Sequence, residues 1–472
     1  MCNILISYFS DYGEAMYDAI TETLLNQNNN IFRFNINRPD VKITTWGGES
    51  ELLNKDILSQ IKNFNPDIVF NFNHSLPKNL YEVLSIKCKI VILDADNPET
   101  FWNKEIILRN FKKYKFLGFQ SYSKEMYERF LCTKLHEGID YIYFPPATII
   151  KSEKKDKNIN ISFIGSNFLP ANIPPFNSNF YTTDALKLYN KFKDDYFFSI
   201  DDAKKIVSSK DIDWLYEIVR SYYVGQDRLK YLQILSDLGL VIFGLRWWKF
   251  VAYYDFDLFS CFSPIPIRTI SENQDIYNSS KISINISHPQ AKTSFSWRVM
   301  DIMASDSCLV MEYKKDWMDL FAHLLSKETL DATIYKDRFD MRNKVLRLLN
   351  DEELRIRCIK DFNHAIESNG RWNKRYLLLN KFLSVNLFND IHSDPTYIHI
   401  PSKIDFFEES DETPKSQKTN RKNLLKRIKL KNRFKLLFYG IQLIFAQLPI
   451  LGLLYNRHNR KKIIRSINKY MR

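Results

Sequence analysis

Cysteine and glycine are scarce in this sequence, and its first residues do not resemble a leader segment. Its 472 residues include six cysteines, which form no Cys-x-x-Cys pair and follow no regular spacing. This scarcity argues against a structural zinc site and a disulfide framework, and it favours a reducing compartment. The 12 glycines are few, which we attribute to genome base composition rather than to mechanism. The chain begins with an apolar, strand-like stretch that no basic segment precedes, so no signal peptide is expected.

Acidic residues are absent from residues 415–472. This segment holds 17 of the 68 Lys and Arg and none of the 55 Asp and Glu, so the rest of the chain carries a net charge of −4 although the whole chain carries +13. A mildly acidic body argues against a nucleic-acid-binding protein, and no nucleic-acid partner is expected. The basic segment instead predicts an appendage that meets its own anionic surface.

An uncharged run at residues 436–455 lies between basic clusters within this tail. About 20 residues is the minimum for a membrane span, but Gln442, Gln447 and Pro449 interrupt the run. Basic clusters on both flanks also leave one of them on the wrong side by the positive-inside rule. We therefore expect amphipathic helices that lie on an anionic leaflet, with a spanning helix as the alternative. The expected location is cytoplasmic and peripheral, at the inner face of the cell membrane.

Strand and helix patterns alternate through most of the remaining chain. Alternation of this kind predicts parallel, Rossmann-like sheets, and a charged crossover at residues 151–157 indicates a hinge between two of them. The predicted parts are an acceptor-side domain at 1–150, a donor domain at 151–385 with a helical insertion at about 167–225, a linker at 386–414 and the tail at 415–472.

Three polar side chains follow predicted strands of the first domain. They are Asp11, His74 and Asp96. Ligands of parallel sheets bind beyond the carboxyl ends of the strands, so these residues are candidates for a catalytic base. Each could equally form a turn or cap a helix, which are common roles for such residues.

Residues 294–310 carry the most informative pattern. Arg298 and Asp301 are three residues apart and share one face of a predicted helix, between strands predicted at 281–287 and 307–311. The start of a helix beside a parallel sheet favours anions, a guanidinium favours phosphate, and a carboxylate suits sugar hydroxyls. These features together predict a nucleotide-sugar site, and the alternative is an ordinary salt bridge within the helix.

Further donor-binding candidates follow other strands of the second domain. Gly165 and Ser166 form a small-residue loop where the backbone can approach a diphosphate, although such a pair may equally be a turn. The remaining candidates are Gly244, Arg246, Lys292 and Glu312.

The segment around Arg298 resembles the donor-site helix of GT-B glycosyltransferases, most of all the CgeB-like group. That group has the pattern Arg-x-x-Glu-x-x-Ala-x-Gly, which this chain matches at Arg298 and Ala304, with Asp301 for the glutamate and Asp306 for the glycine. Weaker likenesses in the expected order extend over roughly residues 90–380, among them the Asp-Ala-Asp-Asn-Pro run that ends at Pro98.

The resemblance implies an α/β fold of two Rossmann-like domains that face each other across a cleft. It implies a glycosyltransferase that moves a sugar from a nucleotide-sugar to a glycan or lipid-linked glycan, with no metal and no cofactor beyond that co-substrate. In this interpretation Arg298, with Lys292, neutralises the diphosphate and Asp301 holds the ribose. A protein glycosyltransferase and a non-catalytic interaction protein of the same fold are the alternatives, and the missing glycine at position 306 favours the latter.

Overall fold

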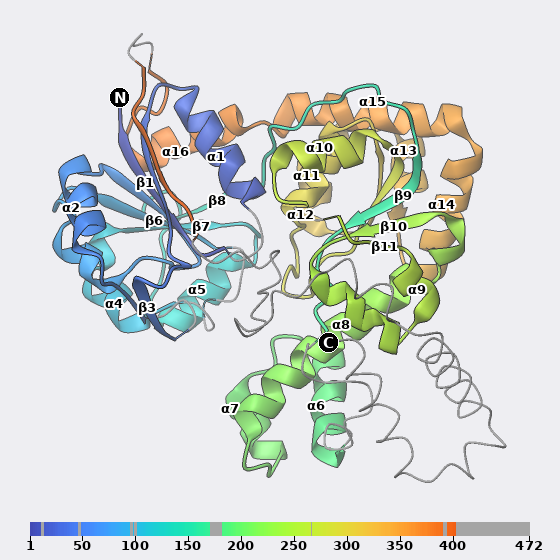
Figure 1. The fold of residues 1–472 in the computed structure, drawn as a ribbon, viewed down its shortest axis with the longest axis horizontal. Coiled ribbons are helices and arrows are strands. Elements are labelled where there is room, and N and C mark those ends of the chain that lie inside the picture. Colours follow the sequence, from blue (N-terminus) through green and yellow to red (C-terminus); the bar gives the residue numbers. More distant parts are fainter. Residues whose placement is uncertain are drawn as a thin grey trace, which may run out of the picture. The chain divides into compact units, whose positions relative to one another are not determined.

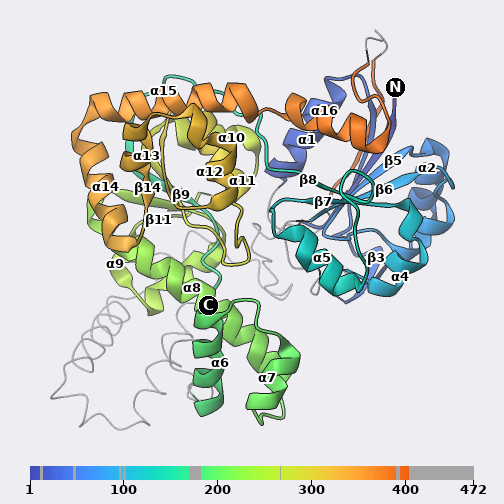
Figure 2. The same ribbon diagram turned by 180° about the vertical axis from the view of Figure 1, so that it is seen from behind.

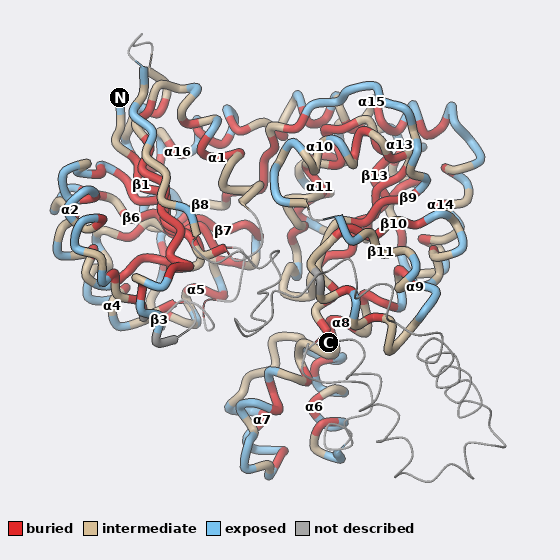
Figure 3. Tube along the Cα trace, viewed as in Figure 1, coloured by how far each residue is buried: buried red, intermediate tan, exposed pale blue. Residues whose placement is uncertain are grey.

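The computed structural model describes residues 1–10, 14–45, 49–94, 98, 102–169, 182–265, 267–389 and 394–402. Two parallel sheets with helices packed against them organise these residues (Figures 1 and 2). Buried residues follow the strands of both sheets (Figure 3). The α/β fold with two Rossmann-like domains is confirmed.

The first sheet has seven described strands in the order β15-β2-β1-β5-β6-β7-β8. The strand Ile68–Phe72, for example, is buried along its whole length, which explains why all of its residues except Asn71 are apolar. The strands are β1 (Asn3–Tyr8), β2 (Asn30–Asn35), β5 (Ile68–Phe72), β6 (Lys89–Asp94), β7 (Tyr114–Gly118), β8 (Tyr141–Tyr143) and β15 (Tyr397–Ile400). The helices are α1 (Ala15–Leu25), α2 (Lys55–Phe64), α4 (Lys104–Arg109) and α5 (Ser123–Leu131), with 3-10 turns η1 (Lys78–Glu82) and η2 (Phe111–Lys113), and a hairpin of β3 (Val41–Thr45) and β4 (Glu49–Leu52).

The second sheet has six described strands in the order β11-β10-β9-β12-β13-β14. They are β9 (Ile159–Ile164), β10 (Leu240–Phe243), β11 (Phe262–Ser263), β12 (Ser280–Asn285), β13 (Cys308–Glu312) and β14 (Ile334–Tyr335). The helices of this part are α9 (Phe256–Ser260), α10 (Ile270–Asn278), α11 (Trp297–Ala304), α12 (Lys315–Phe321), α13 (Lys327–Thr333), α14 (Arg338–Asn350) and α15 (Glu352–Asn369), with 3-10 turns η3 (Ser236–Leu238), η4 (Arg246–Tyr253) and η5 (Ala322–Leu324).

Three helices interrupt the second domain after β9, where the sequence predicts a helical insertion. They are α6 (Thr183–Asp194), α7 (Ile200–Ile206) and α8 (Ile212–Gln233). Their apolar faces form a small core of their own that includes Leu188, Phe192 and Val219. Helix α8 continues beyond residue 225, and its last turns pack into the main core of the second domain through Leu229 and Leu232.

The end of the described chain returns to the first domain, which corrects the predicted boundaries. Trp372, Tyr376 and Leu383 of α16 (Trp372–Leu383) pack with Ile4 and Ile6 of β1. Strand β15 then adds to the edge of the first sheet, with Ile398 opposite Phe32. The linker predicted at 386–414 is therefore wrong over residues 397–400. Four residues carry too little periodicity to identify a strand, and this one depends on β2 as its partner.

The predicted tail at 415–472, including the run at 436–455, lies outside the described residues. Across the part of the chain that the structure describes, no helix combines the length and apolar character needed to cross a membrane.

Candidate functional site

The loops after β9 and β10 meet at two glycines that the sequence singles out. The backbone N–H of Gly165 donates to the carbonyl of Phe243 (2.9 Å), and the indole of Trp248 donates to the carbonyl of Gly165 (2.7 Å). A Cβ atom on Gly244 would lie 2.4 Å from that carbonyl oxygen. Position 244 therefore requires glycine because two backbone segments approach closely there.

Arg298 lies beside this glycine pair. It is in the first turn of α11, and a guanidinium nitrogen is 3.2 Å from where a Cβ on Gly165 would be. Its Cζ lies 5.8 Å from the centre of the Phe163 ring. Within the described residues, Arg298 forms no ion pair, so the salt bridge with Asp301 that was the alternative interpretation is absent. The guanidinium is left for a ligand.

The backbone amides of the first turn of α11 are also available to an anion. The hydroxyl of Ser296, the N-cap residue, donates to Asn285 Oδ1 at the end of β12 (2.7 Å) and does not cap the helix. No side-chain oxygen of the N-cap residue therefore occupies the amides of the first turn, where a helix favours negative charge.

Arg228 of α8 is a member of this site that sequence reasoning missed. Its side chain is 3% exposed and donates to the carbonyls of Ser166 and Ile286, each at 2.7 Å. It thereby joins the loop after β9 to the loop after β12. Burial, together with the positive charge of Arg298, lowers the pKa of Arg228 to about 9.

Glu312 connects the end of β13 to the loop after β12. Its carboxylate accepts from the backbone N–H of Ser287 (2.9 Å) and lies 3.7 Å from the ammonium of Lys314. Lys314 also donates to the carbonyl of Ala291 (2.7 Å). The loops at the carboxyl ends of β9, β12 and β13 thus converge around more cationic than anionic groups, which suits an anionic ligand.

Asp301 has a partner within the protein. Thr148, in the segment that leaves the first domain, donates to its carboxylate at 2.6 Å. Burial raises the pKa of Asp301 to about 6, against the opposing effects of Thr148 and the charge of Arg298. A contact between Asp301 and a donor ribose remains a prediction.

Two other predicted donor residues have different surroundings. Lys292 is exposed, and its ammonium lies 4.0 Å from the centre of the Tyr122 ring at the start of α5. Arg246 begins η4, and its side chain lies outside the described part of the structure.

The departure from the glycosyltransferase pattern at Asp306 produces no backbone strain. Asp306 is not among the described residues with positive φ. Its carboxylate pairs with Lys157 (2.8 Å), and its N–H donates to Asn278 (2.7 Å). An aspartate therefore fits where the pattern has glycine, which removes the reason to favour a non-catalytic protein.

Among the acceptor-side candidates, only His74 lies within the described residues, since Asp11 and Asp96 fall outside them. His74 is 2% exposed, and its Nε2 lies 3.3 Å from the hydroxyls of both Tyr81 and Tyr114. The positive φ of Asn73 and His74, 47° and 54°, turns the chain at the end of β5. The structure thus contradicts His74 as the base, because an acceptor hydroxyl cannot reach a ring enclosed in the core.

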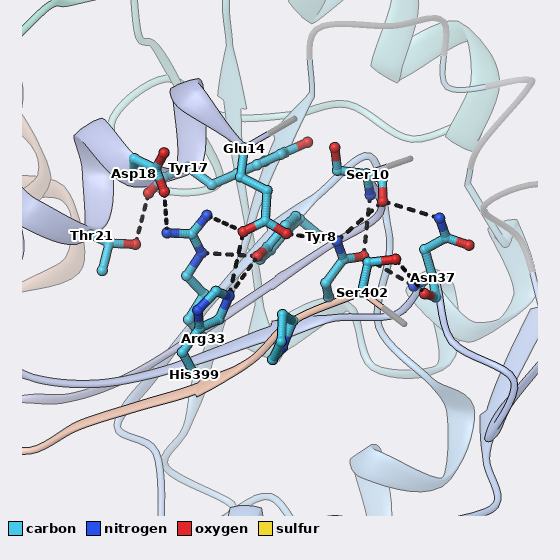
Figure 4. Close-up of polar contacts among 12 residues, drawn as sticks. Tyr8, Ser10, Glu14, Tyr17, Asp18, Thr21, Arg33, Asn37, His399 and Ser402 are labelled. Atoms are coloured by element: carbon cyan, nitrogen blue, oxygen red, sulfur yellow. Dashed lines mark hydrogen bonds and ion pairs between the residues drawn. The ribbon is translucent and has the colours of Figure 1, made fainter. Parts of the chain in front are cut away.

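A buried ionic cluster holds α1 against the first sheet (Figure 4). Arg33 pairs with Glu14 and Asp18, each at 2.6 Å, and donates to the hydroxyl of Tyr8 (2.9 Å). His399 of β15 lies 3.4 Å from Glu14. Burial opposes ionisation of Glu14, but the hydrogen bond from His399 and the charge of Arg33 outweigh it and lower the pKa of Glu14 to about 2. Sequence reasoning missed this cluster because its members come from four elements, one of which, β15, is more than 360 residues from the others.

The loops at the carboxyl ends of the two sheets are joined by hydrogen bonds. Ser121, after β7, donates from its N–H and hydroxyl to Asp316 (2.8 and 2.6 Å). Ser294, just before α11, donates to the carbonyl of Phe119 (2.6 Å). The segment that leads into the Arg298 helix is therefore anchored to the first domain. Among the described residues, no group of three or more His, Cys, Asp and Glu is arranged to hold a metal ion.

The sequence of the second domain matches a family model described as "Glycosyl transferase-like", over residues 231–379. No curated protein matches the chain. Similar solved structures include the T4 phage beta-glucosyltransferase, with a TM-score of 0.38, 11% identity, and coverage of 81% of this chain and 100% of that one. An alpha-glucosyltransferase in complex with UDP-glucose and DNA containing an abasic site has a TM-score of 0.47, 11% identity, and coverage of 81% and 99%. S. aureus TarM has a TM-score of 0.38, 12% identity, and coverage of 73% and 62%.

Proposed function

We propose that this protein is a glycosyltransferase of the GT-B type that takes a sugar from a nucleotide-sugar bound at the carboxyl ends of β9, β12 and β13. The observation that carries the proposal is Arg298, a guanidinium in the first turn of α11 that has no carboxylate partner among the described residues. It lies beside Gly165, which has no side chain to cover the backbone. It also lies within the segment that matches the glycosyl transferase-like family.

In the proposed reaction an acceptor hydroxyl attacks the anomeric carbon, and the bond from that carbon to the diphosphate breaks. The negative charge that develops on the leaving diphosphate is stabilised by Arg298 and the amides of the first turn of α11. We propose that these fixed groups act without a metal ion or a cofactor. If the reaction inverts the anomeric centre, Asp11 and Asp96 are the remaining proposed bases for the acceptor hydroxyl.

Donor binding and hydrolysis test this proposal. The purified full-length protein should hydrolyse at least one member of a panel of UDP-, GDP-, ADP- and CMP-sugars, detected by mass spectrometry, and should do so in the presence of EDTA. Arg298→Ala should bind that donor more weakly, whereas Arg347→Ala, at an exposed position on α14, should behave as the wild type. Failure of the wild-type protein to bind any nucleotide-sugar would refute the proposal.

The proposed acceptor is a lipid-linked glycan at the inner face of a bacterial membrane, which the tail at 415–472 would reach. The support is the charge pattern: 17 basic residues, no acidic ones, and an uncharged middle. Binding to vesicles of anionic lipid should weaken in high salt without vanishing, since buried apolar side chains add a contribution that salt does not screen. A chain that ends at Pro414 should keep its donor affinity and lose activity mainly on lipid-linked acceptors. Equal binding to DNA and to vesicles would contradict this location.

A further inference from the structure

His288 lies in the loop after β12, close to the cations of the candidate donor site. Its Nδ1 accepts a hydrogen bond from the backbone N–H of Gln290 at 3.2 Å. An atom that accepts cannot carry the proton, so the neutral ring holds its hydrogen on Nε2. The rings of Phe168 and Tyr196 meet the imidazole edge-to-face, with centroid distances of 4.8 and 5.3 Å, and fix its orientation.

The charges with the largest effect on His288 are positive. They come from Arg228 and Arg220 of α8 and from Lys314 after β13. Burial, and then these charges, lower the pKa of His288 to about 3. The ring therefore stays neutral throughout the physiological range and offers one N–H donor of fixed direction.

We propose that His288 donates a hydrogen bond from Nε2 to the second phosphate group of the nucleotide-sugar's diphosphate. The inference rests on the proposed function and adds a residue of defined role to its donor site. Nε2 makes no hydrogen bond to the described residues, and the neighbouring cations favour an anion as the occupant. The carbonyl of Ile286, two residues earlier in the chain, is held by Arg228, so the loop that carries the imidazole is anchored beside the same cationic group. A neutral donor adds a contact to phosphate oxygen without adding repulsion to a site that already holds several cations.

Matched variants of the full-length protein test the role of Nε2. His288→Ala removes the donor. His288→Gln keeps an amide N–H that reaches about as far as Nε2. His323→Ala changes an exposed histidine of the same domain and serves as the control. Affinity is measured by calorimetry for UDP, GDP and ADP and for the matching monophosphates, and thermal unfolding confirms that each variant is folded.

For the diphosphate that binds tightest, His288→Ala should lose roughly 10- to 100-fold in affinity, the range expected for a hydrogen bond to a charged acceptor. His288→Gln should recover most of this loss, and His323→Ala should match the wild type. Affinity for the corresponding monophosphate should change less than threefold, because the proposed contact is to the second phosphate group.

The nuclear magnetic resonance signals of the His288 ring distinguish a ligand contact from a purely structural role, because only a ligand contact changes the Nε2 proton signal when the diphosphate is added. With histidine labelled with nitrogen-15, the His288 signals, assigned by their loss in His288→Gln, should show an unprotonated Nδ1 and a protonated Nε2. The Nε2 proton should shift when the diphosphate is added. Wild-type binding together with unchanged affinity in His288→Ala, or equal losses for diphosphate and monophosphate, would overturn the inference alone. A wild-type protein that binds no nucleotide would overturn the proposed function as well.

Discussion

Replacing Asp301 with asparagine should stabilise the fold and weaken donor binding at the same time. The carboxylate has one described hydrogen-bond partner, the Thr148 hydroxyl at 2.6 Å. Burial raises the pKa of Asp301 from 3.8 to about 6. A raised pKa in the folded state means that the ionised form is less favourable there than in the unfolded chain. The asparagine amide keeps an oxygen for Thr148 and removes the buried charge.

The size and sign of the stability effect follow from the two pKa values. Below pH 3.8 Asp301 is protonated in both states and costs nothing, whereas above pH 6 it is ionised in both and the folded state bears the full penalty. Between these values the folded state binds more protons, so the stability of the wild type falls as pH rises. The difference between 3.8 and 6 corresponds to about 3 kcal/mol. Asp301→Asn should therefore be up to about 3 kcal/mol more stable than the wild type at pH 7.5 and equally stable near pH 3.5.

Denaturant unfolding at a series of pH values measures this difference, and other titrating groups cancel in the comparison with the wild type. Thr148→Val is the control, because it keeps the charge of Asp301 and removes the hydrogen bond to it, together with the one that the Thr148 hydroxyl accepts from the Ile150 N–H. It should lower the free energy of unfolding by about 1–3 kcal/mol above pH 6 and by less in acid. A stability difference between Asp301→Asn and the wild type that does not vary with pH would refute the reasoning. Donor affinity should fall in Asp301→Asn and largely persist in Asp301→Glu, the residue of the glycosyltransferase pattern.

Three further substitutions have expected outcomes. Arg298→Ala should lower donor affinity by roughly 1.5–3 kcal/mol without lowering the melting temperature measured in the absence of nucleotide, and calorimetry with the best-bound nucleotide-sugar checks it. Gly244→Ala places a methyl group 2.4 Å from the Gly165 carbonyl oxygen and should cost about 1–3 kcal/mol in chemical unfolding, whereas a wild-type midpoint would show that the loops relax freely. Arg33→Ala should cost about 1–3 kcal/mol, because it removes charge-assisted hydrogen bonds from the half-buried carboxylates of Glu14 and Asp18. The contribution of Glu14, whose pKa is lowered to about 2, is present above pH 4.5 and should be lost as pH falls toward 2. The loss should be smaller in Arg33→Ala, where His399 and Asn35 still hydrogen-bond the carboxylate.

The sheets could be predicted because their central strands are buried on both faces. The runs Ile90–Leu93 and Cys308–Met311, for example, keep an apolar character that few other structures produce. Edge strands lack that constraint. Tyr397–Ile400 is a strand only because the backbone of β2 is available to pair with it, so its sequence alone indicated a linker.

The residues of the candidate site could be predicted only where they lie at the end of a predicted strand or at the start of a predicted helix. Gly165 follows a strand and Arg298 begins a helix, and both positions are visible in a linear pattern. Arg228 lies near the end of a long helix, 62 positions from Ser166, whose carbonyl it holds. Nothing in the sequence around it distinguishes it from an exposed arginine on an amphipathic helix. Contacts of this kind depend on where α8 enters the second domain, which no local pattern specifies.

Arg228 and Arg298 differ in whether the guanidinium group is available to contact a ligand. Arg228 directs its guanidinium to two carbonyls and is fully enclosed, while Arg298 stands beside Gly165 without a described partner. Both lie over the ring of Phe163, at 5.5 and 5.8 Å, close enough for the charge of one to depress the pKa of the other. Within the described residues neither guanidinium is bonded to a carboxylate, and holding two such cations close together is destabilising. An anion bound next to Arg298 would relieve that repulsion, so the geometry that costs stability also favours the binding of a diphosphate.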